Sequence, residues 1–167
     1  LASTAMLFYV YIGYPLVLAL LGLFFRRPRP AAGYTPSVTV LIAAYNEEAA
    51  IRRKIEQTLS LEYPADKLEI LVVSDGSTDQ TDEIVESIHN PRVRLLRMKA
   101  RGGKTNGQNE GVKHCRGEIV VFSDATAIYH TKALLYLASH YSDPKVGAVS
   151  GRYKYFDPED SSPTGLS

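Results

Sequence analysis

The sequence has 167 residues, with 19 Lys and Arg against 18 Asp and Glu and a formal net charge of +1. This balance excludes a nucleic-acid-binding protein that depends on bulk positive charge, so we expect no nucleic acid partner. With 45% hydrophobic and 22% charged residues the chain is too apolar for disorder, and its single cysteine cannot form an internal disulfide or a thiolate metal cage.

The first part of the chain differs from the rest, because residues 1–25 carry no charged side chain. As a helix, residues 6–25 are long enough to cross a hydrocarbon core about 30 Å thick. We therefore interpret residues 1–25 as a transmembrane helix. The alternatives are a buried core helix and a cleavable signal peptide, which needs a basic leader and a small-residue cleavage site. Gly13 and Pro15 predict a kink in this helix.

A basic, proline-rich linker is expected at residues 26–36, where Arg26, Arg27 and Arg29 follow the apolar stretch. Basic residues remain on the cytoplasmic side of a span. We therefore expect residues 37–167 to be cytoplasmic and anchored at the inner membrane. The sequence ends in a polar run, and we interpret residues 37–167 as the truncated N-terminal part of a longer domain.

Short apolar runs bounded by turn signals predict buried strands. Helical patterns alternate with them, which indicates an α/β fold with a mainly parallel sheet covered by helices on both faces. The expected strands are residues 38–44, 68–74, 93–97, 118–124 and 146–150. One helix is expected after Asn46, which would be its N-cap. The others are expected within residues 101–111 and over residues 82–88 and 132–140.

Polar side chains follow the carboxyl ends of four expected strands, which is the edge where open α/β sheets bind ligands. They are Tyr45, Asp75, Lys104 and Asp124. An acid that closes an apolar strand, as Asp124 does, is suited to hold a divalent ion against a diphosphate. The sequence therefore predicts a ligand site at this edge.

The other members of this group leave alternatives open. Tyr45 either stacks on a base or fills the core, and Asp75 either forms a turn or accepts hydrogen bonds from a base or ribose. Lys104 lies in GGKT, but Met98 stands where a P-loop needs its first glycine, so an ATP-binding P-loop is excluded. The segment is either a phosphate-binding loop or a solvated basic loop, and Arg101 has the same two interpretations.

Four segments together resemble the family 2 glycosyltransferases of the GT-A fold. They are PSVTVLIAAYNEE, EILVVSDGSTDQT, GGKTNGQNEG and EIVVFSDAT, in this order, within about residues 37–155. The chain is most similar to the membrane-embedded, processive members, the relatives of cellulose, hyaluronan and poly-N-acetylglucosamine synthases. The resemblance implies an inverting transfer of a sugar from a nucleoside diphosphate donor, usually a UDP-sugar, to a polysaccharide or other glycan acceptor.

The resemblance also implies roles for individual residues. Tyr45 and Glu47 are expected to line the pocket for the nucleobase and ribose, and Asp75 is expected to contact the uracil. Lys104 is expected on the base and phosphate side of the donor. Asn109 is expected near the donor, further along the same helix.

The metal site is where the sequence departs from the family. Asp124 matches the first acid of the family's Asp-x-Asp motif, but Thr126 replaces the second. A divalent cofactor, Mg²⁺ or Mn²⁺, is therefore expected on Asp124 with a weakened protein contribution. The family's general base is expected after Ser167, so no catalytic residue is assigned within these 167 residues.

Two alternatives to this function remain open. One is a membrane-anchored subunit that binds a nucleotide sugar without catalysis, since Thr126 replaces an acid. The other is a transferase that acts on a polyprenyl-phosphate lipid.

Overall fold

The structure, a computed structural model, describes residues 2–24, 31 and 33–152. The strands are β1 (Val38–Ala44), β2 (Leu68–Ser74), β3 (Val93–Arg97) and β4 (Ile119–Asp124). The helices are α1 (Ala2–Phe8), α2 (Tyr14–Phe24), α3 (Ile51–Leu59), α4 (Thr81–Glu86), α5 (Lys104–Val112) and α6 (Ala133–Ser139), with short turns η1 (Tyr9–Gly13), η2 (Ala65–Lys67) and η3 (His140–Ser142).

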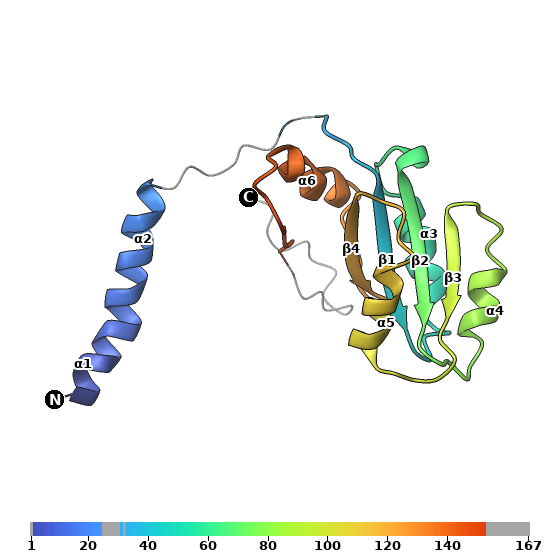
Figure 1. The fold of residues 1–167 in the computed structure, drawn as a ribbon, viewed down its shortest axis with the longest axis horizontal. Coiled ribbons are helices and arrows are strands. Elements are labelled where there is room, and N and C mark those ends of the chain that lie inside the picture. The colour runs from blue at the N-terminus through green and yellow to red at the C-terminus, as the bar shows by residue number, and fades with distance from the viewer. Residues whose placement is uncertain (1, 25–30, 32, 153–167) are drawn as a thin grey trace, which may run out of the picture.

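The strands form one parallel sheet in the order β3-β2-β1-β4. Central strand β1 pairs Val38 with Leu68 of β2 and with Ile119 of β4. All four strands run in the same direction, so their carboxyl ends meet at one edge of the sheet, the lower edge in Figure 1. The α/β fold with a parallel sheet that the sequence predicts is confirmed.

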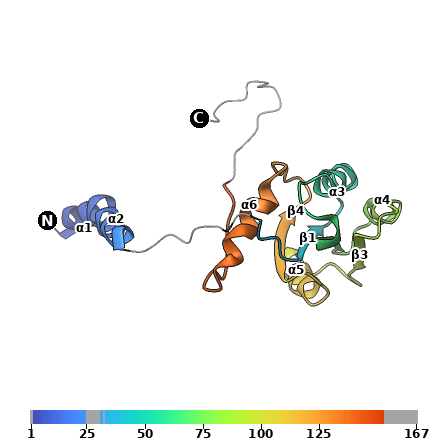
Figure 2. The same ribbon diagram turned by 90° about the horizontal axis from the view of Figure 1, so that it is seen from above.

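Helices cover both faces of the sheet, and Figure 2 shows α3 and α5 on opposite sides. The larger core lies beneath α3, α4 and α6, where alternate β1 and β2 residues pack against Ile51 and Ile55 of α3. The smaller core lies beneath α5 and contains Leu41, Leu71 and Val73. Since β1 and β2 are buried on both faces, their nearly continuous apolar runs follow from the fold.

Helix α5 packs unusually close to the sheet because it presents glycine there. A Cβ atom at Gly111 would lie 2.7 Å from side-chain atoms of both Leu41 and Val73. Such a distance leaves no room for any side chain. Glycine weakens a helix by about 1 kcal/mol relative to alanine, so here close packing outweighs helix propensity.

The N-terminal helices stand apart from the sheet (Figures 1 and 2). Within the described residues there is one helical stretch long and apolar enough to cross a membrane, Ser3–Leu23, with a mean hydropathy of 2.0 and no buried residues. The irregularity predicted near Gly13 takes the form of the π-helical turn η1, in which the Tyr14 N–H donates to the Tyr9 carbonyl. This turn ends two residues before Pro15. Most of the expected linker at residues 26–36 lies outside the described residues.

Two local predictions are wrong. Residues 146–150 form no strand, and residues 147–150 line a cavity beside β4. The run is interrupted by Gly147, and glycine inside a strand weakens it. Asn46 does not cap α3, whose N-cap is Ala50. Asn46 has a φ of +54° and hydrogen-bonds to Thr78 instead.

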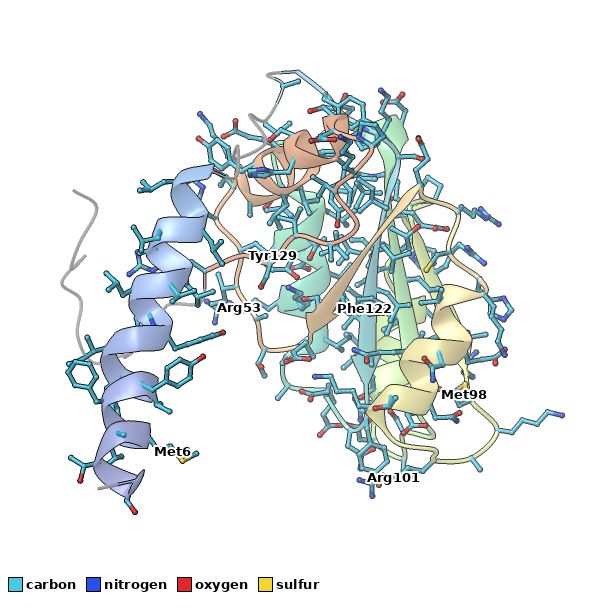
Figure 3. The ribbon with its side chains drawn as sticks, turned by 60° about the vertical axis from the view of Figure 1, so that its left-hand side comes forward. Met6, Arg53, Met98, Arg101, Phe122 and Tyr129 are labelled. Carbon is cyan, nitrogen blue, oxygen red and sulfur yellow. The ribbon has the colours of Figure 1, made fainter. Side chains whose placement is uncertain are left out.

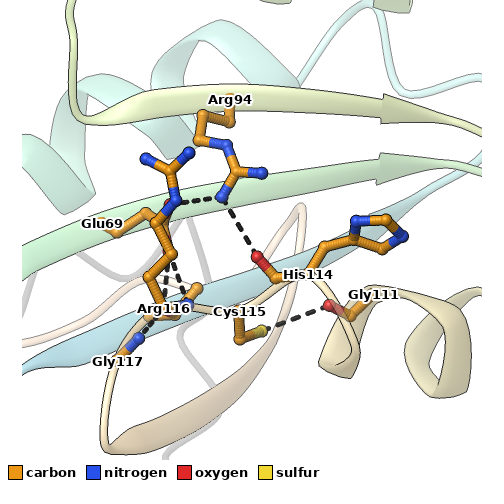
Figure 4. A network of polar contacts seen from close by, with 8 residues as sticks. Glu69, Arg94, Gly111, His114, Cys115, Arg116 and Gly117 are labelled. Carbon is orange, nitrogen blue, oxygen red and sulfur yellow. Dashed lines mark hydrogen bonds and ion pairs between the residues drawn. The ribbon is translucent and has the colours of Figure 1, made fainter.

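At the opposite, amino-terminal edge of the sheet, Glu69 joins three strands (Figure 4). Its carboxylate accepts hydrogen bonds from Arg94 Nη1 at 2.6 Å, Thr39 Oγ1 at 2.8 Å and the Arg116 backbone N–H at 3.2 Å. Burial by itself would raise the pKa of Glu69, but these hydrogen bonds outweigh it and the pKa lies below its usual value. The network fixes the turn that leads from α5 into β4.

Candidate functional site

A cavity of about 360 Å³ opens at the carboxyl edge of the sheet. Five of the six predicted site residues line it. They come from the carboxyl end of β4 and from the segments that follow β1, β2 and β3. They are Tyr45, Glu47, Asp75, Lys104 and Asp124, joined by Arg101, Gly103, Thr126 and three alanines. Asn109 does not line this cavity, since it lies on the exposed side of α5, away from the glycines that face the sheet.

Two loops that carry site residues are tied together beneath the cavity. The Asn46 side-chain oxygen accepts the Thr78 backbone N–H at 2.8 Å, and the Glu47 N–H donates to Thr81 Oγ1 at 2.8 Å. The loop after β1 therefore rests on the loop after β2. This contact fixes the backbone of Tyr45 and Glu47 relative to β2.

Asp79 is the acid of the DGSTD segment that supports this junction. Its carboxylate accepts hydrogen bonds from the Glu48 N–H at 3.1 Å and the Thr81 N–H at 3.0 Å. Desolvation would raise the pKa of Asp79, but hydrogen bonds from Thr81 and the backbone N–H of Glu48 hold it below its usual value. Both carboxylate oxygens of Asp79 thus accept hydrogen bonds within the loops, and Asp79 does not line the cavity.

Asp75 is buried, with 4% of its surface exposed, and it anchors the loop before α5. Its two carboxylate oxygens accept the backbone N–H groups of Gly102 and Gly103, each at 2.7 Å. The neighbouring Gly76 has a φ of +70°, and a Cβ atom there would lie 2.9 Å from the Arg101 nitrogen. Asp75 lines the cavity, as predicted. The sequence did not indicate its hydrogen bonds to the backbone of Gly102 and Gly103.

Arg101 lies over the ring of Tyr45, with its guanidinium carbon 3.9 Å from the ring centroid. Figure 3 shows Arg101 at the carboxyl edge of the sheet. Tyr45 lines the cavity and belongs to neither core cluster. Of the two interpretations of Tyr45, a flat surface for stacking is the one that this position favours.

Lys104 and Asp124 form an ion pair across the cavity. Their side chains are 58% and 53% exposed, so the pair is solvated and contributes little to stability. Residues 101–104 therefore contact Tyr45, Asp75 and Asp124. One segment of the chain therefore contacts three of the predicted donor-binding residues.

The metal-binding capacity of the chain alone is small. The described residues hold no group of three or more His, Cys, Asp or Glu side chains that could bind a metal ion. At the cavity, Asp124 offers a half-exposed carboxylate and Thr126 an exposed hydroxyl. These oxygens fit an ion that a diphosphate brings with it, since Mg²⁺ in particular keeps several waters and phosphate ligands.

Lys54 is a residue near the site that the sequence reasoning missed. It belongs to α3 and is only 3% exposed. Desolvation lowers the pKa of Lys54 to about 8, although the charge of Asp124 acts in the opposite direction. The available signal was its spacing, because Lys54 lies three residues after Ile51 and one before Ile55, on the buried face of the helix.

The model of glycosyl transferase family 2 matches residues 39–166. The chain belongs to this family. This glycosyltransferase family 2 chain is 35% identical, over 140 residues, to a beta-monoglucosyldiacylglycerol synthase from Nostoc sp., covering 79% of the chain and 30% of the relative. It is 35% identical over 116 residues to a poly-beta-1,6-N-acetyl-D-glucosamine synthase from Staphylococcus epidermidis, covering 68% of the chain and 28% of the relative. The chain therefore spans about 30% of the length of these relatives.

Solved structures support the same family and the GT-A fold. A mannosyltransferase from Pyrobaculum calidifontis, in complex with GDP-Man and Mn²⁺, matches with a TM-score of 0.75 and 33% identity over 92% of this chain and 47% of its own. TarS from S. aureus, in complex with UDP-GlcNAc, matches with a TM-score of 0.58 and 28% identity over 62% of this chain and 30% of its own. The resemblance found in the sequence motifs is confirmed.

Proposed function

We propose that the cavity at the carboxyl edge binds a nucleoside diphosphate sugar, with a UDP-sugar as the expected donor. The observation that carries this proposal is the convergence of an aromatic ring, a buried carboxylate, a lysine and an exposed carboxylate on one cavity. An aromatic face suits a nucleobase, and an ammonium group suits a diphosphate. The neighbours in complex with UDP-GlcNAc and with GDP-Man support this class of donor.

In the proposed complex, Tyr45 stacks on the base and Glu47 faces the ribose. Lys104 binds the diphosphate, for which it has to leave Asp124. Asp75 keeps the loop of Arg101 in place and accepts a hydrogen bond from the uracil, since each carboxylate oxygen has more than one lone pair. Asn109 would reach the donor only if α5 moved.

Asp124 and Thr126 are the residues that would hold a divalent cofactor, Mg²⁺ or Mn²⁺, with the donor's phosphates completing its oxygen shell. When bound, the ion neutralises the negative charge that develops on the departing diphosphate. Lys104 supplies a second positive charge at the same oxygens. We propose that the general base, which takes the acceptor's proton as its hydroxyl attacks the anomeric carbon, follows Ser167.

The acceptor is proposed to be a glycan at the cytoplasmic face of the inner membrane, with the helix Ser3–Leu23 as the anchor. The similarity to the poly-beta-1,6-N-acetyl-D-glucosamine synthase supports a polysaccharide acceptor. The similarity to the beta-monoglucosyldiacylglycerol synthase favours a second candidate, transfer to a membrane lipid. Both candidates place the cavity next to a membrane.

Isothermal titration of the full chain in detergent, with UDP, GDP and ADP in the presence and absence of Mn²⁺, tests donor binding. We expect UDP to bind, and Mn²⁺ to strengthen that binding. Asp124→Asn should abolish the gain that Mn²⁺ gives, Thr126→Ala should change it little, and Thr126→Asp should increase it. No UDP binding by the parent chain, or a full gain in Asp124→Asn, would contradict the proposal.

Catalysis is tested separately from binding. Membranes that contain the complete protein are incubated with UDP-sugars, and release of UDP is measured with an oligosaccharide or a diacylglycerol acceptor. Acceptor-dependent release identifies the enzyme and its acceptor class. Binding of UDP without any release, across donors and acceptors, would support the non-catalytic subunit instead.

A further inference from the structure

Lys54 is a charged residue on the core-facing side of α3. The buried residues of this helix are Ile51, Lys54, Ile55 and Thr58, whereas the adjacent Arg53 is exposed, as Figure 3 shows. An ammonium group that loses its water needs other partners, or its burial is costly. In the part of the chain that the structure describes, no carboxylate lies within ion-pair distance of Lys54 Nζ.

The partners of Lys54 belong to the connection that follows β4. Its Nζ donates a hydrogen bond to the Ala127 carbonyl at 2.7 Å and lies 3.7 Å from the centroid of the Tyr129 ring. A backbone carbonyl and an aromatic face are both favourable for a desolvated cation. Lys54 thus exchanges its hydration for contacts with this connection.

Two further donors hold the same connection. Gln57 Nε2 donates to the Tyr129 carbonyl at 2.5 Å, and the Glu62 backbone N–H donates to the Thr131 carbonyl at 2.9 Å. Together with the lysine contact, these bonds engage the carbonyls of alternate residues. The connection after β4 is therefore held along α3 and the turn that follows it.

The lysine contact is the one nearest to the site. Asp124, Ala125 and Thr126 line the cavity, and the Ala127 N–H donates to the Asp124 carbonyl at 3.3 Å. A chain of hydrogen bonds therefore runs from Lys54 through the peptide groups of Ala127 to the residue proposed to bind the metal. Without Lys54, the Ala127 carbonyl would lose its partner and the turn would gain freedom.

We infer that Lys54 is a positioning residue, which holds the turn after β4 so that Asp124 and Thr126 present their oxygens to a nucleotide-bound divalent ion. The inference rests on the proposed function, because it concerns the same cavity. Lys54 does not touch the donor, and it acts through Ala127.

The test compares Lys54→Met with the parent chain. Methionine keeps the length and the apolar stem of the side chain but has neither the charge nor the donor. We expect the affinity for UDP without metal to stay within about two-fold, and the gain from Mn²⁺ to fall about 10-fold or more, as for other groups that orient a metal ligand. The melting temperature should change little, because removal of a desolvated charge offsets the lost hydrogen bond.

Two control variants separate positioning from general stability. Ile55→Ala removes buried apolar atoms from the same helix face and should lower the melting temperature while keeping the Mn²⁺ gain. Arg53→Met removes a neighbouring exposed charge and should change neither quantity. If Ile55→Ala loses the gain as Lys54→Met does, the effect is one of stability and the inference is wrong.

Gln57→Leu provides a second test if Lys54→Met does not fold. It removes another donor to the same connection and should reduce the Mn²⁺ gain by a smaller factor. A full gain in Gln57→Leu, or in a folded Lys54→Met, would overturn the inference while leaving donor binding intact. Absence of UDP binding in the parent would instead contradict the proposed function.

Discussion

Asp75 is a residue whose predicted and observed contacts differ. Its position after β2 predicts a ligand contact, whereas the structure gives both carboxylate oxygens to the N–H groups of Gly102 and Gly103. The loop that Asp75 holds carries Arg101 and leads into Lys104. A single buried carboxylate therefore controls the position of two cations in the cavity.

We predict that Asp75→Ala weakens UDP binding more than it destabilises the fold. The substitution removes two hydrogen bonds to a charged acceptor, each worth about 1.5–3 kcal/mol, and the loop that carries Lys104 would lose its anchor. Calorimetric titration should show a UDP affinity at least about 10-fold lower, with a smaller relative change in thermal unfolding. Equal UDP affinity in Asp75→Ala and parent would refute the role of Asp75 at the site.

The ion pair between Lys104 and Asp124 leads to a prediction about metal binding in the absence of nucleotide. Because the ammonium group occupies the carboxylate that the ion needs, Lys104→Met should raise the affinity for Mn²⁺ alone. The expected factor is about two- to five-fold, the range of a solvated ion pair. The same variant should lower the affinity for UDP, since the phosphates lose their cation.

Electron paramagnetic resonance of free Mn²⁺ measures the first quantity and calorimetry the second. Lys113→Met is a matched control, because Lys113 pairs with Glu110 at the far end of α5. If Lys104→Met leaves nucleotide-free Mn²⁺ binding unchanged, the two groups do not compete.

At the scale of the elements, the two ends of the strands have different roles. The carboxyl edge carries the loops of the cavity, and the amino edge carries the Glu69 network that joins β1, β2, β3 and the turn before β4 (Figure 4). The side chain of Glu69 is 14% exposed. Its hydrogen bonds are therefore partly shielded from water and favour the ionised carboxylate.

We predict that Glu69→Gln reduces the stability of the chain at neutral pH and reduces its sensitivity to acid. A carboxyl group whose pKa is lowered on folding stabilises the native state above its unfolded pKa, near 4.5, and this contribution is lost as the pH falls through the folded pKa. At neutral pH the loss of charge-assisted hydrogen bonds should cost about 2 kcal/mol.

Thermal unfolding of the full chain in detergent between pH 7 and pH 3, followed by circular dichroism, measures this effect. The difference between parent and variant should shrink as the pH falls below about 4.5. Glu56→Gln is a control on the exposed side of α3, where it pairs with Arg52 at 4.0 Å. A difference that stays constant over the whole range would rule out the linkage to Glu69.

At the scale of the whole molecule, β4 is an edge strand of the sheet that the described residues form. Phe122 is 51% exposed, and a cavity of about 360 Å³ lies between β4, α6 and residues 147–152. On the other edge, β3 is only half-buried. An unpaired apolar strand edge is a site for association between molecules.

We predict that a truncated chain of residues 36–167 expresses poorly or aggregates, because it exposes this edge without a partner. Size-exclusion chromatography and thermal unfolding of the purified product measure this. Phe122→Lys in the same truncation should reduce the association, since a charge on an edge opposes strand pairing. A monodisperse parent truncation that unfolds cooperatively would show that the described sheet is stable alone.

The sequence by itself determined four of the five expected strands and the family. Strands β1, β2 and β3 have the bounds that the sequence predicts. For β1 and β2 the reason is burial on both faces of a parallel sheet, which requires nearly continuous apolar residues. The polar residues after the strands predicted which side chains meet at the carboxyl edge. Tyr45, Asp75, Lys104 and Asp124 could be named because parallel strands end at a common edge, whereas Glu47 was named from the resemblance to the family.

Only the tertiary structure decided which groups meet. The ion pair of Lys104 with Asp124, the contact of Arg101 with Tyr45 and the hydrogen bond of Lys54 to Ala127 join residues far apart in the sequence. Residues 146–150 were predicted as a strand, and only the structure shows that they form none. Local patterns specify what a residue is able to do, whereas its partner is specified by packing, which depends on every element of the fold at once.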